Sequence, residues 1–169
     1  MVRRSFPALA KGDQALGRLL VAGCVLEDLV DLFSEGRRVE LQNLSFNQGK
    51  ELRVTGVPEP NPVGFAINVG ESECNIALHI NPRFQGCGPG VIVLNAMKDG
   101  SWGAEVRDER NFPFRQGEKF EVSITFGNEQ FCISLDNGNM LEFPNRLEQP
   151  QYSKIWFTGD VRITGMYVK

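Results

Sequence analysis

The chain is poor in the residues from which metal sites and many catalytic centres are built. Its 169 residues include one histidine and four cysteines, Cys24, Cys74, Cys87 and Cys132, which form no CxxC pair. A zinc site of cysteine and histidine ligands is therefore not expected, because such sites use closely spaced ligand pairs. We predict no metal and no cofactor, and we interpret the cysteines as free thiols of a reducing compartment.

Positive charge and long apolar runs are also scarce. Lys and Arg number 18 against 21 Asp and Glu, which gives a net charge of −3. Nucleic acid is not an expected partner, because phosphate binding needs concentrated positive charge. No apolar run reaches the roughly 18 residues of a membrane span. The short apolar patch at residues 19–26 is flanked by charged residues, so we do not expect a signal peptide.

Residues 1–38 form an extension whose periodicity differs from the rest. Leu16, Leu19, Leu20, Leu26 and Val30 recur near helical spacing, which predicts one amphipathic helix at about 14–34 in an otherwise helical or disordered extension. The helix could pack on the following domain or fray in solvent, or it could bind a partner or a second copy. A targeting segment or an error in the gene model are further alternatives.

From Val39 to Lys169 the period changes to two. In "KFEVSITF", apolar residues alternate with polar ones, and "GFAINVG" and "QFCISL" follow the same pattern. Gly, Pro and Asn turn signals separate these runs, and Asn137-Gly138 suits a hairpin turn that needs positive φ. The pattern predicts an all-β fold, a jelly-roll β-sandwich of two antiparallel sheets.

A row of polar side chains follows one of these strands. In "NIALHINPRF", alternation places Ile76, Leu78 and Ile80 toward the core, and Asn75, Ala77, His79, Asn81 and Arg83 toward the other face. His79, Asn81 and Arg83 would then stand about 7 Å apart in a row. Asn95 in "VIVLNA" and Glu105 and Arg107 in "WGAEVR" follow, and strands joined by short turns tend to be neighbours.

This set of side chains suits a sugar. Hydroxyl groups both donate and accept, so they are recognised by amides, carboxylates and guanidinium groups. An indole such as that of Trp102 suits the apolar C–H face of a pyranose. Each residue alone is more typical of a solvated or partly buried strand position, and Glu105 beside an arginine is commonly a weak surface ion pair. The argument depends on their combination.

"HINPR", "VLN" and "WGAEVR", in this order, resemble the galectin signature H-x-N-P-R, V-x-N and W-x-x-E-x-R at every signature position. The resemblance covers about residues 39–169, and "GDVRITGMYVK" looks like the closing strand of prototype fish galectins. It implies a jelly-roll carbohydrate-recognition domain that binds β-galactosides such as lactose or N-acetyllactosamine without a metal, on galactose-containing glycans and glycoproteins.

The resemblance also implies a role for each signature residue: His79, Asn81, Arg83, Asn95, Trp102, Glu105 and Arg107. The first three would hold the axial 4-hydroxyl of galactose, and Asn95 and Glu105 would take its 6-hydroxyl. Trp102 would stack on the galactose ring, and Glu105 and Arg107 would contact the second sugar. Arg83 nearby should disfavour a charged imidazole, and His79 would act partly as a hydrogen-bond acceptor. We therefore expect galactoside affinity to fall below about pH 6, as the imidazole becomes charged.

The chain departs from the family pattern in two places. Many prototype members carry a second histidine where this chain has Cys87, in a loop at 85–90 that is one residue shorter. If Cys87 is exposed beside the groove, bound lactose should slow its alkylation. The other departure is the extension at 1–38, since prototype members usually begin near the first strand and dimerise through terminal strands.

We therefore expect a homodimeric lectin of the cytoplasm that also acts outside the cell after unconventional secretion. The alternative is a galectin-fold interaction module with weak or lost sugar binding. An enzyme is not expected. Glycoside hydrolysis usually needs two facing carboxylates, whereas the predicted groove offers Glu105 alone, and no Ser or Asp partner for His79 is visible in the sequence.

Overall fold

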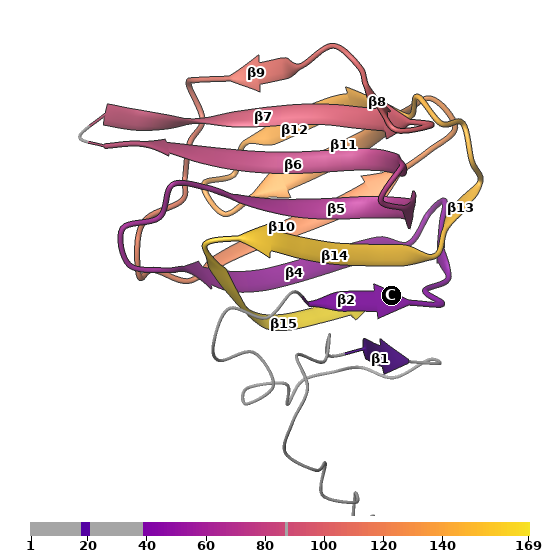
Figure 1. Ribbon diagram of the computed structural model, residues 1–169, viewed down its shortest axis with the longest axis horizontal. Coiled ribbons are helices and arrows are strands. Elements are labelled where there is room, and N and C mark those ends of the chain that lie inside the picture. Colours follow the sequence, from indigo (N-terminus) through magenta and orange to yellow (C-terminus); the bar gives the residue numbers. More distant parts are fainter. Residues whose placement is uncertain (1–17, 21–38, 87) are drawn as a thin grey trace, which may run out of the picture.

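The computed structural model describes residues 18–20, 39–86 and 88–169, and every regular element in these ranges is a strand (Figure 1). The strands are β1 (Arg18–Leu20), β2 (Glu40–Gln42), β3 (Phe46–Asn47), β4 (Glu51–Pro58), β5 (Phe65–Ser72), β6 (Asn75–Gln85), β7 (Gly88–Lys98), β8 (Ser101–Trp102), β9 (Val106–Asp108), β10 (Phe120–Phe126), β11 (Gln130–Leu135), β12 (Met140–Pro144), β13 (Gln151–Tyr152), β14 (Lys154–Gly159) and β15 (Val161–Val168).

Two sheets lie face to face. The first has the order β1-β2-β14-β5-β6-β7-β8, with β9 also paired to β7, and the second has the order β12-β11-β10-β4-β15. A short β13-β3 pair stands apart from them. In Figure 1, β5, β6, β7 and β14 form the layer in front of β10, β11 and β12. All strand pairs except β1–β2 are antiparallel, which confirms the predicted all-β sandwich.

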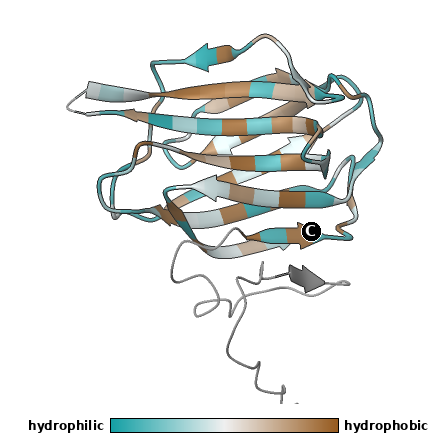
Figure 2. Ribbon diagram, viewed as in Figure 1, coloured by the Kyte–Doolittle hydropathy of each residue, from teal (hydrophilic) through white to brown (hydrophobic). Residues whose placement is uncertain are grey.

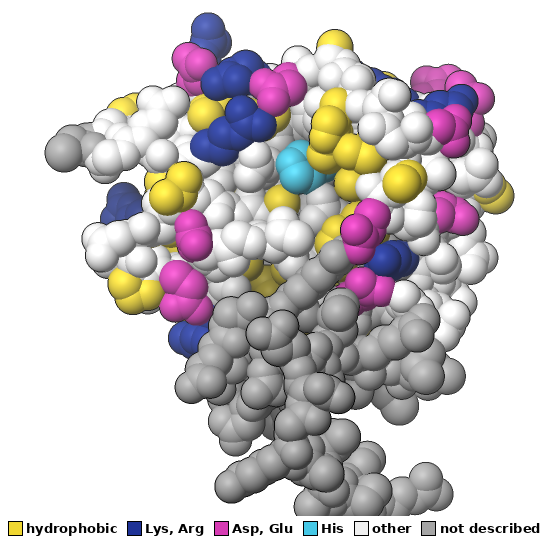
Figure 3. All heavy atoms as spheres, in the orientation of Figure 1, with side chains coloured by type: hydrophobic (Ala, Val, Ile, Leu, Met, Phe, Trp, Pro, Cys, Tyr) yellow, Lys and Arg dark blue, Asp and Glu magenta, His cyan; other side chains and the backbone are white. Residues whose placement is uncertain are grey.

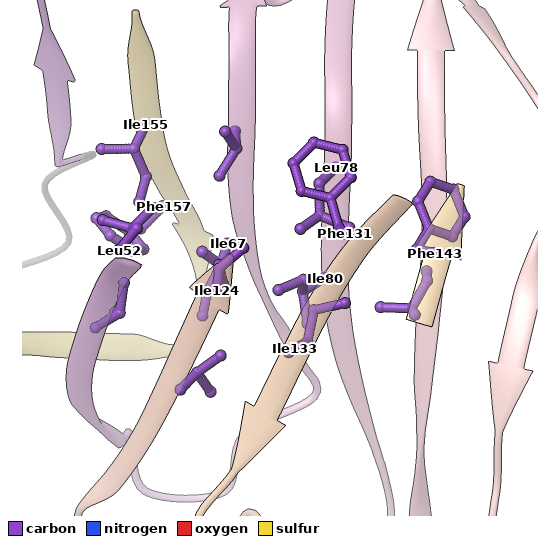
Figure 4. Close-up of a cluster of buried hydrophobic side chains, with 14 of the residues drawn as sticks. Leu52, Ile67, Leu78, Ile80, Ile124, Phe131, Ile133, Phe143, Ile155 and Phe157 are labelled. Atoms are coloured by element: carbon purple, nitrogen blue, oxygen red, sulfur yellow. The ribbon is translucent and has the colours of Figure 1, made fainter. Parts of the chain in front are cut away.

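The core lies between these sheets, where alternate side chains of both layers meet. Along β10 the burial alternates, with Val122 and Ile124 fully buried and Glu121 and Ser123 only partly so. Figure 2 shows the same alternation of hydrophilic and hydrophobic residues along β5, β6 and β7, and Figure 4 shows the buried side chains of the two layers. Burying one such aliphatic or aromatic side chain contributes about 1.5–3 kcal/mol. The predicted turn is also present, since Gly138 has a φ of 80°.

A β-bulge changes the alternation at the start of β6. Ile76 pairs with Met97 of β7 and His79 pairs with Asn95, so two residues of β6 stand opposite one residue of β7. Ala77 consequently belongs to the core, whereas Ile76 lines a cavity on the outer face beside His79. Our assignment of Ile76 to the core and Ala77 to the outer face was therefore wrong, because a bulged residue shifts the alternation by one. Beyond the bulge, from Leu78 to Arg83, the predicted faces hold.

The helix predicted at 14–34 lies mostly outside the described residues. Within that range only Arg18–Leu20 are described, and they form β1, which pairs in parallel with β2 (Figure 1). At these three residues the prediction of a helix does not hold. Backbone pairing explains the strand, since the free edge of β2 offers N–H and C=O groups to an added segment.

We predict that Gly70→Ala lowers the free energy of unfolding by about 1–3 kcal/mol. A Cβ at Gly70 would stand 2.4 Å from the carbonyl oxygen of Asn75 and 3.0 Å from the Cα of Ile76, both in the backbone of the bulged strand. Chemical denaturation measures the change. Gly127→Ala is the matched control, because a Cβ there meets no atom within 4 Å, and we expect a change within about 0.5 kcal/mol. Equal stability of the two variants would contradict the close approach at the bulge.

Candidate functional site

The strand register brings the predicted site residues together on the outer face of the first sheet. His79 of β6 pairs with Asn68 of β5 on one side and with Asn95 of β7 on the other. Arg107 of β9 pairs with Val93, which itself pairs with Asn81. The remaining members come from the same strands and the adjoining β8–β9 segment, so the full set is contiguous: His79, Asn81, Arg83, Asn95, Trp102, Glu105 and Arg107.

One carboxylate organises the charged part of this surface. Glu105 accepts a hydrogen bond from Arg83 Nη2 at its Oε1 and from Arg107 Nη1 at its Oε2, each at 2.9 Å. These two guanidinium groups lower the pKa of Glu105, and the hydrogen bond from Arg83 is the larger cause. Glu105 is therefore ionised, and both of its oxygens already have a fixed cationic donor. This leaves it unsuited to donate a proton as a general acid.

Asn81 extends the row toward the backbone of β5. Its Oδ1 accepts a hydrogen bond from Arg83 Nε at 2.7 Å, and its Nδ2 donates to the carbonyl oxygen of Phe65 at 2.6 Å. Arg83 is thus held at Nε by Asn81 and at Nη2 by Glu105. Two separate contacts leave a guanidinium little freedom, so the donors that Arg83 presents have a fixed direction.

Asn95 is buried, and it ties the segment after β8 to β7. Its Nδ2 donates to the carbonyl oxygen of Gly103 at 2.9 Å, and its Oδ1 accepts from the backbone of Ala96 at 2.8 Å. Arg146, which follows β12, donates from Nη1 to Asn95 Oδ1 at 3.2 Å and to the carbonyl oxygen of Ala104 at 2.9 Å. Arg146 therefore supports the segment between Trp102 and Glu105.

Sequence reasoning missed two supporting residues, Arg146 and Asn68. Arg146 lies 51 positions after Asn95 in the sequence, so no local pattern connects the two. Asn68 was visible as a polar residue within the apolar run "GFAINVG", and this was the available signal. It is 2% exposed, and its Oδ1 lies 2.6 Å from Nδ1 of His79.

The imidazole of His79 is largely enclosed. Its ring packs against Trp102, with ring centroids 4.8 Å apart and planes inclined at 58°. Burial lowers the pKa of His79 to about 4, with a further lowering by the charge of Arg83 and a smaller opposing effect of Glu105. We therefore expect the loss of affinity near pH 4 instead of below about pH 6. Burial, which a strand pattern does not reveal, moves the protonation of the folded protein to about pH 4.

An open cavity of about 230 Å³ adjoins the imidazole and the indole. Its walls come from β5, β6, β7, β8 and β14 and from the β5–β6 turn: Asn68, Glu73, Ile76, His79, Met97, Trp102, Trp156 and Thr158. Trp102 is 49% exposed at its rim. Figure 3 shows the histidine in cyan, with hydrophobic side chains on one side and basic and acidic side chains on the other. A ligand with both an apolar face and polar edges fits this division.

A larger cavity of about 740 Å³ lies away from this surface, at the end of β12. Its lining residues are mainly polar and include Gln48, Asn128, Asn145 and Arg146. Arg146 reaches from it to Asn95 and Ala104. We place the candidate site at the smaller cavity, because the chemically distinctive residues gather there.

The site contains no cluster typical of a bound metal. Among the described residues, no group of three or more His, Cys, Asp or Glu side chains could hold a metal ion. No helix in that part of the chain could span a membrane either. β6 ends at Gln85, which pairs with Gly88 of β7 within the glycine-rich segment noted in the sequence. The prediction for alkylation of Cys87 falls on a residue outside the described ranges.

We predict that the only histidine titrates near pH 4 in the folded protein, and that ligand affinity stays constant from pH 7.5 to about 5. Since the folded pKa is below the ordinary value of 6.5, the unfolded chain binds more protons between pH 6.5 and 4. Stability present above pH 6.5 should therefore be lost progressively toward pH 4. NMR titration of the imidazole carbon-bound protons measures the pKa, and a midpoint near 6.5 would contradict the enclosure of the ring.

Comparisons of the sequence and of the fold with known proteins point to the same family. The family model of the galactoside-binding lectins matches residues 38–168. A β-galactoside-binding lectin of Electrophorus electricus is 43% identical over 129 residues, which cover 76% of this chain and 95% of that relative. Congerin-2 of Conger myriaster is 41% identical over 129 residues, which cover 75% of this chain and 94% of that relative. The solved structure of lactose- and MES-liganded congerin II superimposes with a TM-score of 0.73 at 40% identity, over 78% of this chain and 99% of that one.

Proposed function

Because the chain belongs to the galactoside-binding lectin family, we propose that it is a β-galactoside-binding lectin whose ligand lies along β6, β7 and β8. The observation that carries the placement is Glu105 held between Arg83 and Arg107, beside an imidazole packed on a half-exposed indole. This arrangement presents fixed hydrogen-bonding partners for hydroxyl groups next to an aromatic ring. Recognition of a sugar uses both, because a sugar has polar hydroxyl groups and an apolar C–H face.

In this proposal each group of the site has a role. The 4-hydroxyl of galactose lies between His79, Asn81 and Arg83, and its axial direction distinguishes galactose from its epimer. An epimer with an equatorial hydroxyl would leave His79 and Arg83 without this hydroxyl as a partner, and an unmet polar group in a binding site is costly. Trp102 covers the apolar face of the same ring, and Asn95 contacts its 6-hydroxyl. Arg83, Glu105 and Arg107 face the second sugar.

Binding in this site needs neither a metal nor covalent chemistry. Both oxygens of Glu105 already accept from guanidinium groups, whose positive charges disfavour a metal ion beside this carboxylate. The same two hydrogen bonds keep this carboxylate ionised, which suits recognition of hydroxyl donors and not acid catalysis. A non-enzymatic lectin is therefore the function that the site supports best.

We propose that the lectin works as a homodimer. A single open groove binds weakly, and two linked grooves would gain affinity on clustered glycans through effective concentration. Among the described strands, β15 pairs on one side only, with β4, so its other edge offers backbone groups to a second copy.

We also propose that it acts in the cytoplasm and, after unconventional secretion, outside the cell. The free thiols of Cys74 and Cys132, the first of them exposed, suit synthesis in a reducing compartment.

We predict that Trp102→Ala weakens lactose binding at least about tenfold, because the sugar ring loses its aromatic contact. Isothermal titration calorimetry measures the change, with sucrose as the control ligand. Met140→Ala is the matched protein control, since Met140 is an exposed apolar residue on β12 of the other sheet. Lactose binding lost in the first variant and kept in the second supports the proposed groove. A folded wild type that binds no lactose would instead favour an interaction module that keeps the fold without the sugar.

We predict that Arg146→Leu weakens lactose binding about three- to tenfold, although Arg146 is not assigned a contact with the sugar. The substitution removes the hydrogen bonds to Asn95 and to the carbonyl oxygen of Ala104, so the segment from Trp102 to Glu105 loses a support. The amide signals of residues 103–105 should broaden or shift in NMR spectra of the sugar-free protein. Unchanged spectra and unchanged affinity would show that Asn95 alone fixes this segment.

A further inference from the structure

Asn68 is a buried amide among the outer-face residues of the first sheet. In the register it stands between Trp156 of β14 and His79 of β6. Its Nδ2 donates to the carbonyl oxygen of Trp156 at 3.3 Å, and its Oδ1 lies 2.6 Å from His79 Nδ1. Buried amides of this kind are normally hydrogen-bonded, and both ends of Asn68 have a partner.

These two contacts determine which group donates and which accepts in the chain of hydrogen bonds from Trp156 through Asn68 to His79. A backbone carbonyl oxygen accepts and never donates, so the amide nitrogen of Asn68 must face Trp156. The amide oxygen then faces His79, and it can only accept. His79 must therefore carry its hydrogen on Nδ1, because a bare nitrogen opposite a bare oxygen would be repulsive. The other ring nitrogen, Nε2, is left without a hydrogen as an acceptor.

We propose that Asn68 is a positioning residue that sets the specificity of the site by holding His79 as the Nδ1–H tautomer. With Nε2 restricted to accepting, the site requires a hydroxyl that donates at the 4-position of galactose. The inference rests on the proposed function for its ligand, but the tautomer itself can be measured without one. Asn68 would then act on the sugar only through His79.

The surroundings of His79 keep its imidazole neutral at ordinary pH, and only a neutral imidazole has two tautomers. The charged groups facing the ring are Arg83 on its own strand and Glu105 after β8, while Glu73 of the β5–β6 turn lines the same cavity. Burial and the Arg83 cation both disfavour the imidazolium, and Glu105 offsets them only in part. The ring is therefore neutral when ligand binds, and a neutral imidazole has one donor and one acceptor that must be assigned.

The first test measures the tautomer in the sugar-free protein by long-range ¹H–¹⁵N NMR. The chain has one histidine, so the spectrum contains one imidazole. We expect Nδ1–H in the wild type and in Asn68→Asp, whose carboxylate still accepts from Nδ1. We expect Asn68→Leu to lose this preference and to populate Nε2–H. Nε2–H in the wild type, or unchanged Nδ1–H in Asn68→Leu, would overturn the proposal.

The second test compares lactose with its 4′-deoxy-4′-fluoro analogue, in which the fluorine of the galactose ring can accept weakly but cannot donate. The wild type should bind lactose at least about tenfold more tightly than the analogue. In Asn68→Leu this ratio should fall at least about fivefold, because Nε2–H no longer needs a donor. Asn68→Asp should keep the wild-type ratio, and it is the matched control for substitution at a buried position.

The ratio of the two affinities distinguishes a change of specificity from a general loss of folded protein. A misfolded fraction would reduce the apparent binding of lactose and of the analogue equally. Thermal unfolding of each variant establishes that it is folded. An unchanged ratio in Asn68→Leu would overturn the specificity role, even if both affinities fall. If the folded wild type binds no lactose, the proposed function fails, and the sugar-free NMR measurement still decides whether Asn68 fixes the ring.

Discussion

The register of β6 against β5 and β7 is the constraint on which the site depends. Because strand side chains alternate, a slip of one residue would turn His79, Asn81 and Arg83 into the core. Leu78 and Ile80 prevent such a slip, since both are fully buried between the sheets. The bulge at Ala77 then completes the surface, because it brings Ile76 to the outer face beside the imidazole. Core packing and ligand chemistry are therefore fixed by the same pairing.

The polar groups of the site are largely satisfied before any ligand arrives. Asn95 and Asn81 bond to the backbone, and Glu105 bonds to two arginines. Such mutual bonding costs little when a sugar binds, because few side chains have to be ordered at that moment. It also divides the surface by polarity. In the proposed complex the arginines would donate, Nε2 of His79 would accept, and the indole of Trp102 would cover apolar carbon of the sugar.

Much of this could be predicted from the sequence, because the decisive signals are local. Period-two alternation gave the two-sheet fold, and the spacing within "HINPR" and "WGAEVR" placed the polar residues on one face. The position of Ile76 could not be predicted, because a bulge depends on the pairing of two other strands. The role of Arg146 and the extent to which burial lowers the pKa of His79 could not be predicted either, since both depend on packing between residues that are distant in the chain.

Asn68 shows why a buried polar residue in an apolar strand is informative. The strand reading treated "GFAINVG" as alternating core positions and left the asparagine without a role. A side chain that is 2% exposed must find partners, and the carbonyl oxygen of Trp156 in β14 fixes the orientation of the Asn68 amide. Because that carbonyl oxygen can only accept, the donor and acceptor of each hydrogen bond from β14 to the imidazole are determined. In the role proposed for Asn68, a central strand of the sheet would thereby influence which hydroxyl the surface accepts.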